Sequence, residues 1–70
     1  MDRASVSIDT EYIKLDSLLK LANAVSSGGE AKLMIQGGEV SLNGEICTQR
    51  GRKIRPGDVV SLPGLEIVVS

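Results

Sequence analysis

The residues with the clearest chemical potential form a short basic run. Four of the six positions from 50 to 55 carry a guanidinium or ammonium group: Arg50, Arg52, Lys53 and Arg55. Like charges this close repel one another, and the repulsion costs free energy unless an anionic partner relieves it. Arginine and lysine neutralise phosphates and release condensed counterions, which supplies affinity without reading a base sequence. The run therefore indicates a site for a phosphate backbone.

Polar residues before the run could extend such a site. Lys32 and Gln36 are spaced i and i+4, so they share one face of a predicted helix. Lys20 falls off the apolar stripe of the helix before it. Asn43 precedes Gly44 in a predicted hairpin turn, and the turn by itself can explain both residues. We include Lys20, Lys32 and Gln36 with the basic run as expected contacts to nucleic acid.

The composition offers little for catalysis or metal binding. Histidine is absent, which removes the commonest general base and the commonest zinc ligand. Cys47 is the single cysteine, so neither an internal disulfide nor a thiolate metal site can form, and we interpret it as a small packing residue. We therefore expect a binding protein without enzymatic activity, cofactor or metal.

The scarcity of aromatic residues narrows the kind of nucleic acid. Proteins that hold single strands stack bases on aromatic rings, whereas this chain has one tyrosine and neither Phe nor Trp. Structured RNA is recognised by its shape and through phosphate and 2′-hydroxyl contacts. The net charge of −1 argues weakly against nucleic acid, but the acids lie mostly outside the basic run, so one face can still be basic. Structured RNA is thus the expected partner.

The length and hydropathy of the chain indicate one small domain. Seventy residues, 41% of them hydrophobic, suffice for a single domain spanning 1–70 with an aliphatic core. No apolar run approaches the roughly 20 residues of a membrane helix, and the first residues lack a secretory pattern. The lone cysteine fits a reducing compartment. We expect a cytoplasmic monomer that does not contact a membrane.

Two helices are predicted in the first half of the chain. An apolar stripe at i, i+3, i+4 and i+7 indicates the first helix: Leu15, Leu18, Leu19 and Ala22. Ser27, followed three residues later by Glu30, forms a capping-box pattern and predicts a second helix near 28–36. The glycine pair at 37–38 should end it.

The remaining segments alternate with a period of two, which predicts strands. The Asn-Gly turn joins residues 39–42 and 45–48 into a hairpin. Further strands are expected at 4–8, 59–62 and 65–69, and 49–55 is interpreted as a polar connection. The predicted fold class is α+β, with two N-terminal helices packed on a small mixed sheet that includes the hairpin. The first and last strands could pair to close that sheet.

Taken in order, several short motifs resemble the alpha-L RNA-binding motif, also called the S-four domain. They span 14–62 and consist of Lys14-Leu15-Asp16 with Leu18-Leu19, Ala31-Lys32, then Ile35, Gly38, Val40, Leu42 and Asn43-Gly44, and finally Pro56-Gly57-Asp58-Val59. The segment 27–32 is most similar to the short stand-alone bacterial branch, whose members associate with ribosomes or ribosomal RNA. Two positions depart from the pattern, because Lys14 and Gly28 stand where many members have arginine.

The resemblance implies a protein that binds structured RNA, ribosomal RNA above all, through phosphates and shape. Carried over by position, the RNA-facing residues are Lys20, Lys32, Gln36, Asn43, Arg50, Arg52, Lys53 and Arg55. An alternative is a protein-interaction module of ubiquitin-like fold, since such domains also show Asn-Gly-Glu turns and a Gly-Asp before a strand. Two adjacent helices before the hairpin disfavour that fold.

Overall fold

The computed structural model describes residues 2–70 and is an α+β fold. Within that range the elements are, in chain order, β1 (Asp2–Val6), β2 (Ile13–Lys14), α1 (Leu15–Leu21), α2 (Gly28–Gln36), β3 (Ser41–Leu42), β4 (Glu45–Ile46), β5 (Lys53–Ile54), β6 (Val59–Leu62) and β7 (Leu65–Val69). The prediction of two N-terminal helices is therefore wrong, because both helices follow β1 and β2 in the chain. Both β1 and β2 come first, because each pairs with a strand from the second half of the chain.

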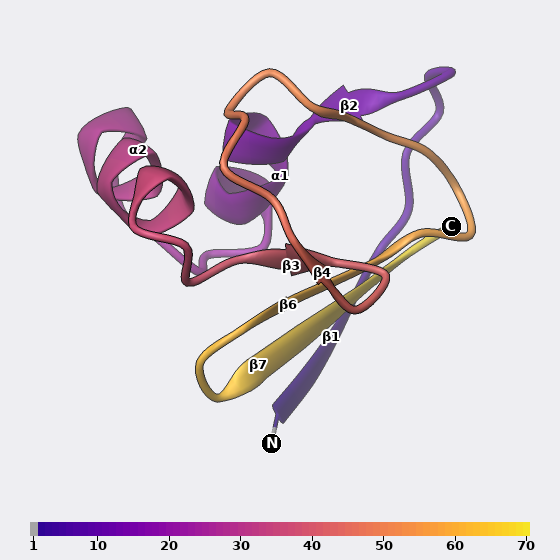
Figure 1. The fold of residues 1–70 in the computed structure, drawn as a ribbon. Coiled ribbons are helices and arrows are strands. Elements are labelled where there is room, and N and C mark those ends of the chain that lie inside the picture. Colours follow the sequence, from indigo (N-terminus) through magenta and orange to yellow (C-terminus); the bar gives the residue numbers. More distant parts are fainter. Residues whose placement is uncertain (1) are drawn as a thin grey trace.

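The main sheet has five strands in the order β1-β7-β6-β3-β4 and is mixed. Its first and last strands in sequence, β1 and β7, pair in parallel, which confirms the expected closure, while the other neighbours are antiparallel. Figure 1 shows both helices grouped on one side of this sheet. The strand β1 begins at residue 2, two residues earlier than predicted, because β7 offers it partners from Leu65 onward.

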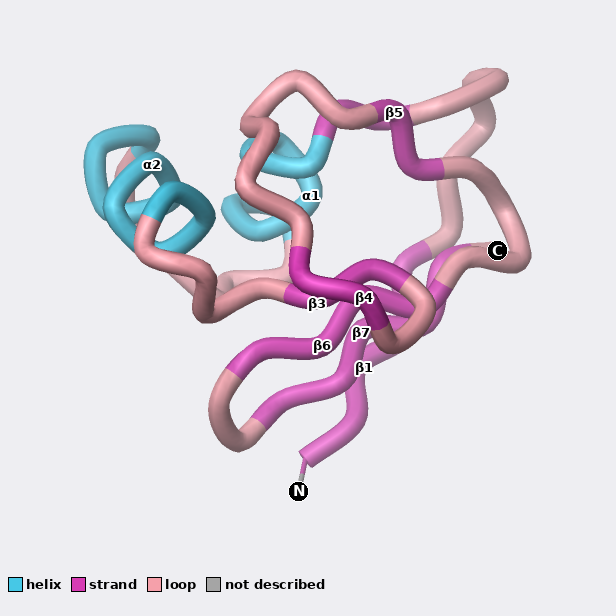
Figure 2. The backbone as a smooth tube through the Cα atoms, in the orientation of Figure 1, coloured by secondary structure: helices cyan, strands magenta, loops and turns pink. Residues whose placement is uncertain are grey.

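A second, two-stranded sheet joins β2 to β5 and was not predicted. Ile13 lies opposite Ile54, and Lys14 lies opposite Lys53. Ile54 is fully buried, so the segment interpreted as a polar connection is anchored in the core at this one apolar residue. Strands of two residues leave no alternating pattern, and their pairing spans about forty residues, so local periodicity could not reveal them. Figure 2 shows the loop into β5 running over the start of α1.

The core is aliphatic, as the composition required. The predicted stripe of α1 supplies Leu15, Leu18 and Leu19, and all three are fully buried, whereas Ala22 is half-buried just past the helix end. Ile35 of α2 and Ile67 of β7 are fully buried in the same cluster. The core therefore holds the two helices against the sheet and so fixes the place of every segment between them.

The second helix begins and ends where the sequence predicted. Ser27 is its N-cap, and the Ser27 Oγ accepts a hydrogen bond from the main-chain N–H of Glu30 at 3.3 Å. The Glu30 carboxylate accepts in turn from the Ser26 hydroxyl at 3.0 Å. At the other end Gly37 is the C-cap, and its N–H donates to the Leu33 carbonyl at 2.9 Å. These caps satisfy terminal backbone groups that a nine-residue helix would otherwise leave to water.

Candidate nucleic-acid interface

The basic run is bound to the start of α1 through its backbone. The N–H of Leu15 donates to the Arg52 carbonyl at 2.9 Å, and the N–H of Asp16 donates to the Arg50 carbonyl at 3.2 Å. The side chain of the N-cap residue, Lys14, makes no capping hydrogen bond, and the Asp16 carboxylate accepts only from the N–H of Ser17 at 2.8 Å. The loop carbonyls thus take over the capping function, since the first amides of a helix have no partner within it. This contact fixes the path of the run while its four basic side chains stay exposed.

A second attachment ties the hairpin turn to the end of the basic run. Asn43 has φ 51, a left-handed conformation that asparagine tolerates, and Gly44 follows with φ 90, as a tight hairpin turn requires. The Asn43 amide donates to Asp58 Oδ1 at 3.1 Å, and its oxygen accepts from the N–H of Val59 at 2.9 Å. Asp58 Oδ2 accepts from the N–H of Arg55 at 2.8 Å. The side chain of Asn43 is therefore used within the fold.

Between these attachments lies an open hollow of about 710 Å³, which we name the basic hollow. Three of the predicted cations line it: Arg52, Lys53 and Arg55. Asn43 and Asp58 line its wall on the hairpin side. The fold therefore brings together three of the four basic side chains of the run around one depression, and Arg50 lies outside it.

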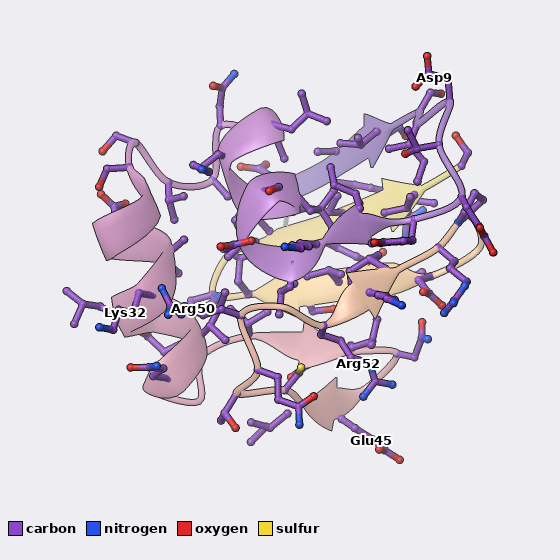
Figure 3. All side chains as sticks on the ribbon, turned by 90° about the horizontal axis from the view of Figure 1, so that it is seen from above. Asp9, Lys32, Glu45, Arg50 and Arg52 are labelled. Atoms are coloured by element: carbon purple, nitrogen blue, oxygen red, sulfur yellow. The ribbon has the colours of Figure 1, made fainter. Side chains whose placement is uncertain are left out.

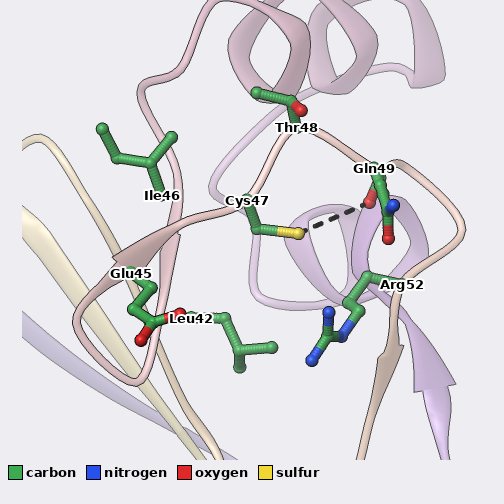
Figure 4. Close-up of a pocket in the computed structure, with 7 residues that line it drawn as sticks. All are labelled: Leu42, Glu45, Ile46, Cys47, Thr48, Gln49 and Arg52. Carbon is green, nitrogen blue, oxygen red and sulfur yellow. Dashed lines mark hydrogen bonds between the residues drawn. The ribbon is translucent and has the colours of Figure 1, made fainter.

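A smaller hollow of about 210 Å³ adjoins the first, and we name it the hairpin hollow. The two share Leu42, Gln49 and Arg52 in their linings. Figure 4 shows Glu45 and Arg52 on either side of Leu42, with the guanidinium of Arg52 directed inward. Cys47 is buried in this wall, and its Sγ donates weakly to the Gln49 carbonyl at 3.8 Å, which confirms its interpretation as a packing residue.

The cations of the basic hollow form no ion pair within residues 2–70, although the carboxylate of Asp58 lines the same hollow. Among residues 2–70 the single ion pair joins Arg3 and Glu66, 2.9 Å apart, on β1 and β7. Lys53 instead places its Nζ 4.9 Å from the centroid of the Tyr12 ring. A cation held over a ring is attracted to its face but keeps its charge. The positive potential of the hollow is thus available to an anionic ligand.

The other predicted contacts are exposed but lie outside both hollows. They are Lys20 on α1, Lys32 and Gln36 on α2, and Arg50 in the loop. In the view of Figure 3, Lys32 and Arg50 lie toward one end and Arg52 toward the hairpin, whereas Asp9 lies at the opposite edge. The structure therefore groups three of the predicted cations around one hollow and leaves Lys20, Lys32 and Arg50 elsewhere on the surface.

Two residues near the basic hollow were missing from the predicted contacts. Lys14 lies directly opposite Lys53 in the antiparallel β2–β5 pair, so the two ammonium groups project from the same face. Tyr12 carries the ring beneath Lys53. Only Lys14 had a signal in the sequence, since it occupies the position of the first arginine of the motif. The β2–β5 pairing that brings both residues beside Lys53 has no local pattern.

No group of three or more metal-ligating side chains gathers within residues 2–70. In the same range, neither helix has the length and hydropathy to cross a membrane.

Comparison with known proteins agrees with this geometry. The family model described as "S4 domain" matches residues 6–70. The chain is 49% identical over 59 residues to "Probable ribosome maturation protein RlbA" of Bacillus subtilis (strain 168), covering 84% of this chain and 83% of the relative. It is 36% identical over 58 residues to "Putative RNA-binding protein YbcJ" of Escherichia coli (strain K12), covering 83% of each. A fold of two helices and a mixed sheet, with a cationic hollow beside the hairpin, thus belongs to a chain that is a member of the S4 domain family.

Proposed function

We propose that this protein binds structured RNA, and ribosomal RNA in particular, through phosphate contacts at the basic hollow. One observation carries the proposal: Arg52, Lys53 and Arg55 line a single depression, and none of them forms an ion pair with any residue from 2 to 70. Folding thus gathers three cations and one carboxylate, that of Asp58, around the hollow, and the excess of positive charge favours an anionic ligand. A phosphate ridge places several negative charges against such a surface at once.

The remaining predicted residues extend this interface. Lys20, Lys32, Gln36 and Arg50 are exposed outside the hollow, and in this proposal they offer further donors to phosphate or 2′-hydroxyl oxygens. Asn43 is the last of the predicted contacts. Its side chain holds the hairpin turn to Asp58, and the residue is exposed beside the bound RNA in this proposal. Because Tyr12 is half-buried beneath Lys53, no ring is left for a row of stacked bases. This favours a folded or helical RNA over an extended single strand.

The relatives support a place beside the ribosome. The name of the Bacillus subtilis relative describes ribosome maturation, and that of the Escherichia coli relative describes RNA binding. We propose that this chain acts likewise, as a cytoplasmic monomer that binds without catalysing a reaction. Membership of the S4 domain family favours this role over the ubiquitin-like alternative.

The proposal is tested by titrating a structured ribosomal RNA fragment across a series of salt concentrations. Neutralising about four phosphates should give a slope of about −3 to −4 in log K against log salt, taking the duplex coefficient. Replacing Arg52, Lys53 and Arg55 together by Glu should abolish binding while the protein stays folded. Binding that is independent of salt, or unchanged in the triple variant, would refute the proposal.

A further inference from the structure

The hairpin hollow contains two opposite charges that do not meet. Glu45 and Arg52 both line it, yet they form no ion pair, and neither side chain has a hydrogen-bond partner among residues 2–70. Figure 4 shows Leu42 between them. The hollow thus presents a carboxylate that accepts hydrogen bonds, a planar donor and a few apolar atoms, arranged around a space of about 210 Å³. That space is smaller than the roughly 300–1,000 Å³ of pockets for drug-sized ligands, so it suits a single small ring system.

Arg52 can provide the stacking surface that an aromatic ring supplies in other RNA-binding proteins. In RNA recognition, unpaired bases stack on guanidinium planes as well as on aromatic side chains. The backbone of Arg52 is fixed, because its carbonyl accepts from Leu15 at 2.9 Å and its N–H donates to the Gln49 carbonyl at 3.2 Å. Leu42 and Cys47, 9% and 8% exposed, contribute a few apolar atoms to a lining that is otherwise mostly polar, and Ile46, 69% exposed, lies at the rim. A flat base would cover these apolar atoms.

Glu45 restricts which base fits. A carboxylate has only acceptor oxygens, so it binds a base edge that presents N–H groups. Guanine presents two neighbouring donors on its Watson–Crick edge, at N1 and N2, and these match the two carboxylate oxygens. Adenine, cytosine and uracil each present a single donor group beside an acceptor, which would face a negative oxygen.

We propose that the hairpin hollow binds one unpaired guanine of the RNA, stacked on Arg52 and hydrogen-bonded to Glu45. The inference rests on the proposed function, because an RNA backbone bound at the basic hollow is what brings the base to the neighbouring hairpin hollow. Arg52 lines both spaces, so one side chain contacts the phosphates and the base next to them. The protein thereby recognises a helix interrupted by a bulged guanine.

The test measures dissociation constants for RNA hairpins that are identical except for one bulged nucleotide, G, A, C or U, together with a fully paired hairpin. The bulged G should bind on the order of tenfold more tightly than the other bulges, as expected for one bidentate base contact. Excess guanosine monophosphate should not displace the RNA. Displacement by equimolar nucleotide would mean that the hollow takes a free nucleotide, and would overturn the assignment to RNA.

Two matched pairs of variants locate the contact. Glu45→Gln should reduce the preference for guanine to less than about threefold, whereas Glu39→Gln, which removes the same charge outside both hollows, should leave it unchanged. Arg52→Lys should remove the advantage of the bulged hairpins over the fully paired one but keep the salt slope, since lysine retains the charge without the plane on which any base stacks. Arg3→Lys is its control, because it makes the same exchange on β1, outside both hollows. These side chains are exposed, and equal unfolding midpoints would verify that every variant folds.

The outcomes separate the two proposals. Equal, salt-dependent binding of all four bulges, or a guanine preference that survives in Glu45→Gln, overturns the base site and leaves the proposed function in place. Failure of every hairpin to bind overturns both.

Discussion

The side-chain amide of Asn43 donates to Oδ1 of Asp58 at 3.1 Å, across fifteen residues of sequence. Asp58 also accepts from the N–H of Arg55 at 2.8 Å through its other oxygen. Both residues line the basic hollow. One carboxylate thus joins the hairpin turn to the end of the basic run, and the two walls of the proposed RNA site cannot separate without breaking these bonds.

Replacing Asn43 by glycine should destabilise the protein by about 1–2 kcal/mol, because two net hydrogen bonds are lost while glycine accepts the backbone conformation. Asn43→Ala should cost about 1–2 kcal/mol more, since its φ of 51 is strained for alanine. Urea denaturation of the three proteins measures both differences. A glycine variant as stable as the parent would show that the amide bonds contribute nothing.

Each cation of the basic hollow should contribute one phosphate contact. Arg52→Gln, Lys53→Gln and Arg55→Gln should each make the salt slope shallower by about 0.9. The control is Arg3→Gln on β1, which removes the same charge where Arg3 already pairs with Glu66, and it should leave the slope unchanged. Fluorescence anisotropy titrations with one RNA at several salt concentrations provide these slopes. Equal effects at all four positions would point to net charge alone.

Lys14 should favour RNA binding at a cost in stability. It lies opposite Lys53, and like charges facing each other across strands are destabilising. Lys14→Glu should therefore raise the free energy of unfolding by about 0.2–1 kcal/mol while weakening RNA binding. Lys14→Gln should fall between the two proteins in both measurements. If stability and affinity instead fall together, Lys14 has a structural role only.

Gly28 offers a position where an additional phosphate contact can be built. It is the first residue of α2, and a Cβ placed there meets no atom within 4 Å. Gly28→Arg should bind the RNA several-fold more tightly at low salt and steepen the slope by about 0.9, because one more phosphate is neutralised. Gly28→Gln shares the new side-chain bulk without the charge and serves as the control. An equal gain in both variants would exclude a phosphate contact.

Because Ile54 is fully buried, we expect its packing in the core to hold the basic run in place. Ile54→Val should destabilise the protein by about 0.5–1.5 kcal/mol, because a fully buried methyl group is removed. The same change at Ile46, which is 69% exposed, should alter stability by less than about 0.5 kcal/mol. Thermal unfolding of the two variants compares them directly. Equal midpoints would contradict the anchoring of β5.

The elements that carry a local signal were predicted closely. The Leu15–Leu18–Leu19 stripe, the Ser27 cap, the Asn43-Gly44 turn and the last two strands lie where the sequence placed them. In each case the pattern is contained in a few neighbouring residues, so propensity and hydrogen-bonding chemistry act before any distant contact forms. The order of the short motifs likewise sufficed to identify the family.

The site needed contacts that no short segment encodes. The pairing of Ile13 with Ile54, the capping of α1 by the Arg50 and Arg52 carbonyls, and the bond from Asn43 to Asp58 each join parts of the chain remote in sequence. These contacts decide that Arg52, Lys53 and Arg55 surround one hollow and that Arg50 does not. They also place Glu45 across from Arg52.

The sequence by itself thus determined the two helices, the hairpin turn, the last two strands, the aliphatic core, the family and the crowding of cations in one short run. Only the tertiary structure decided which cations share a surface and which acid lies beside them. The physical reason is that side-chain direction depends on long-range backbone pairing, whose stability comes from burying Ile54 and its partners together, and local patterns carry no record of that packing.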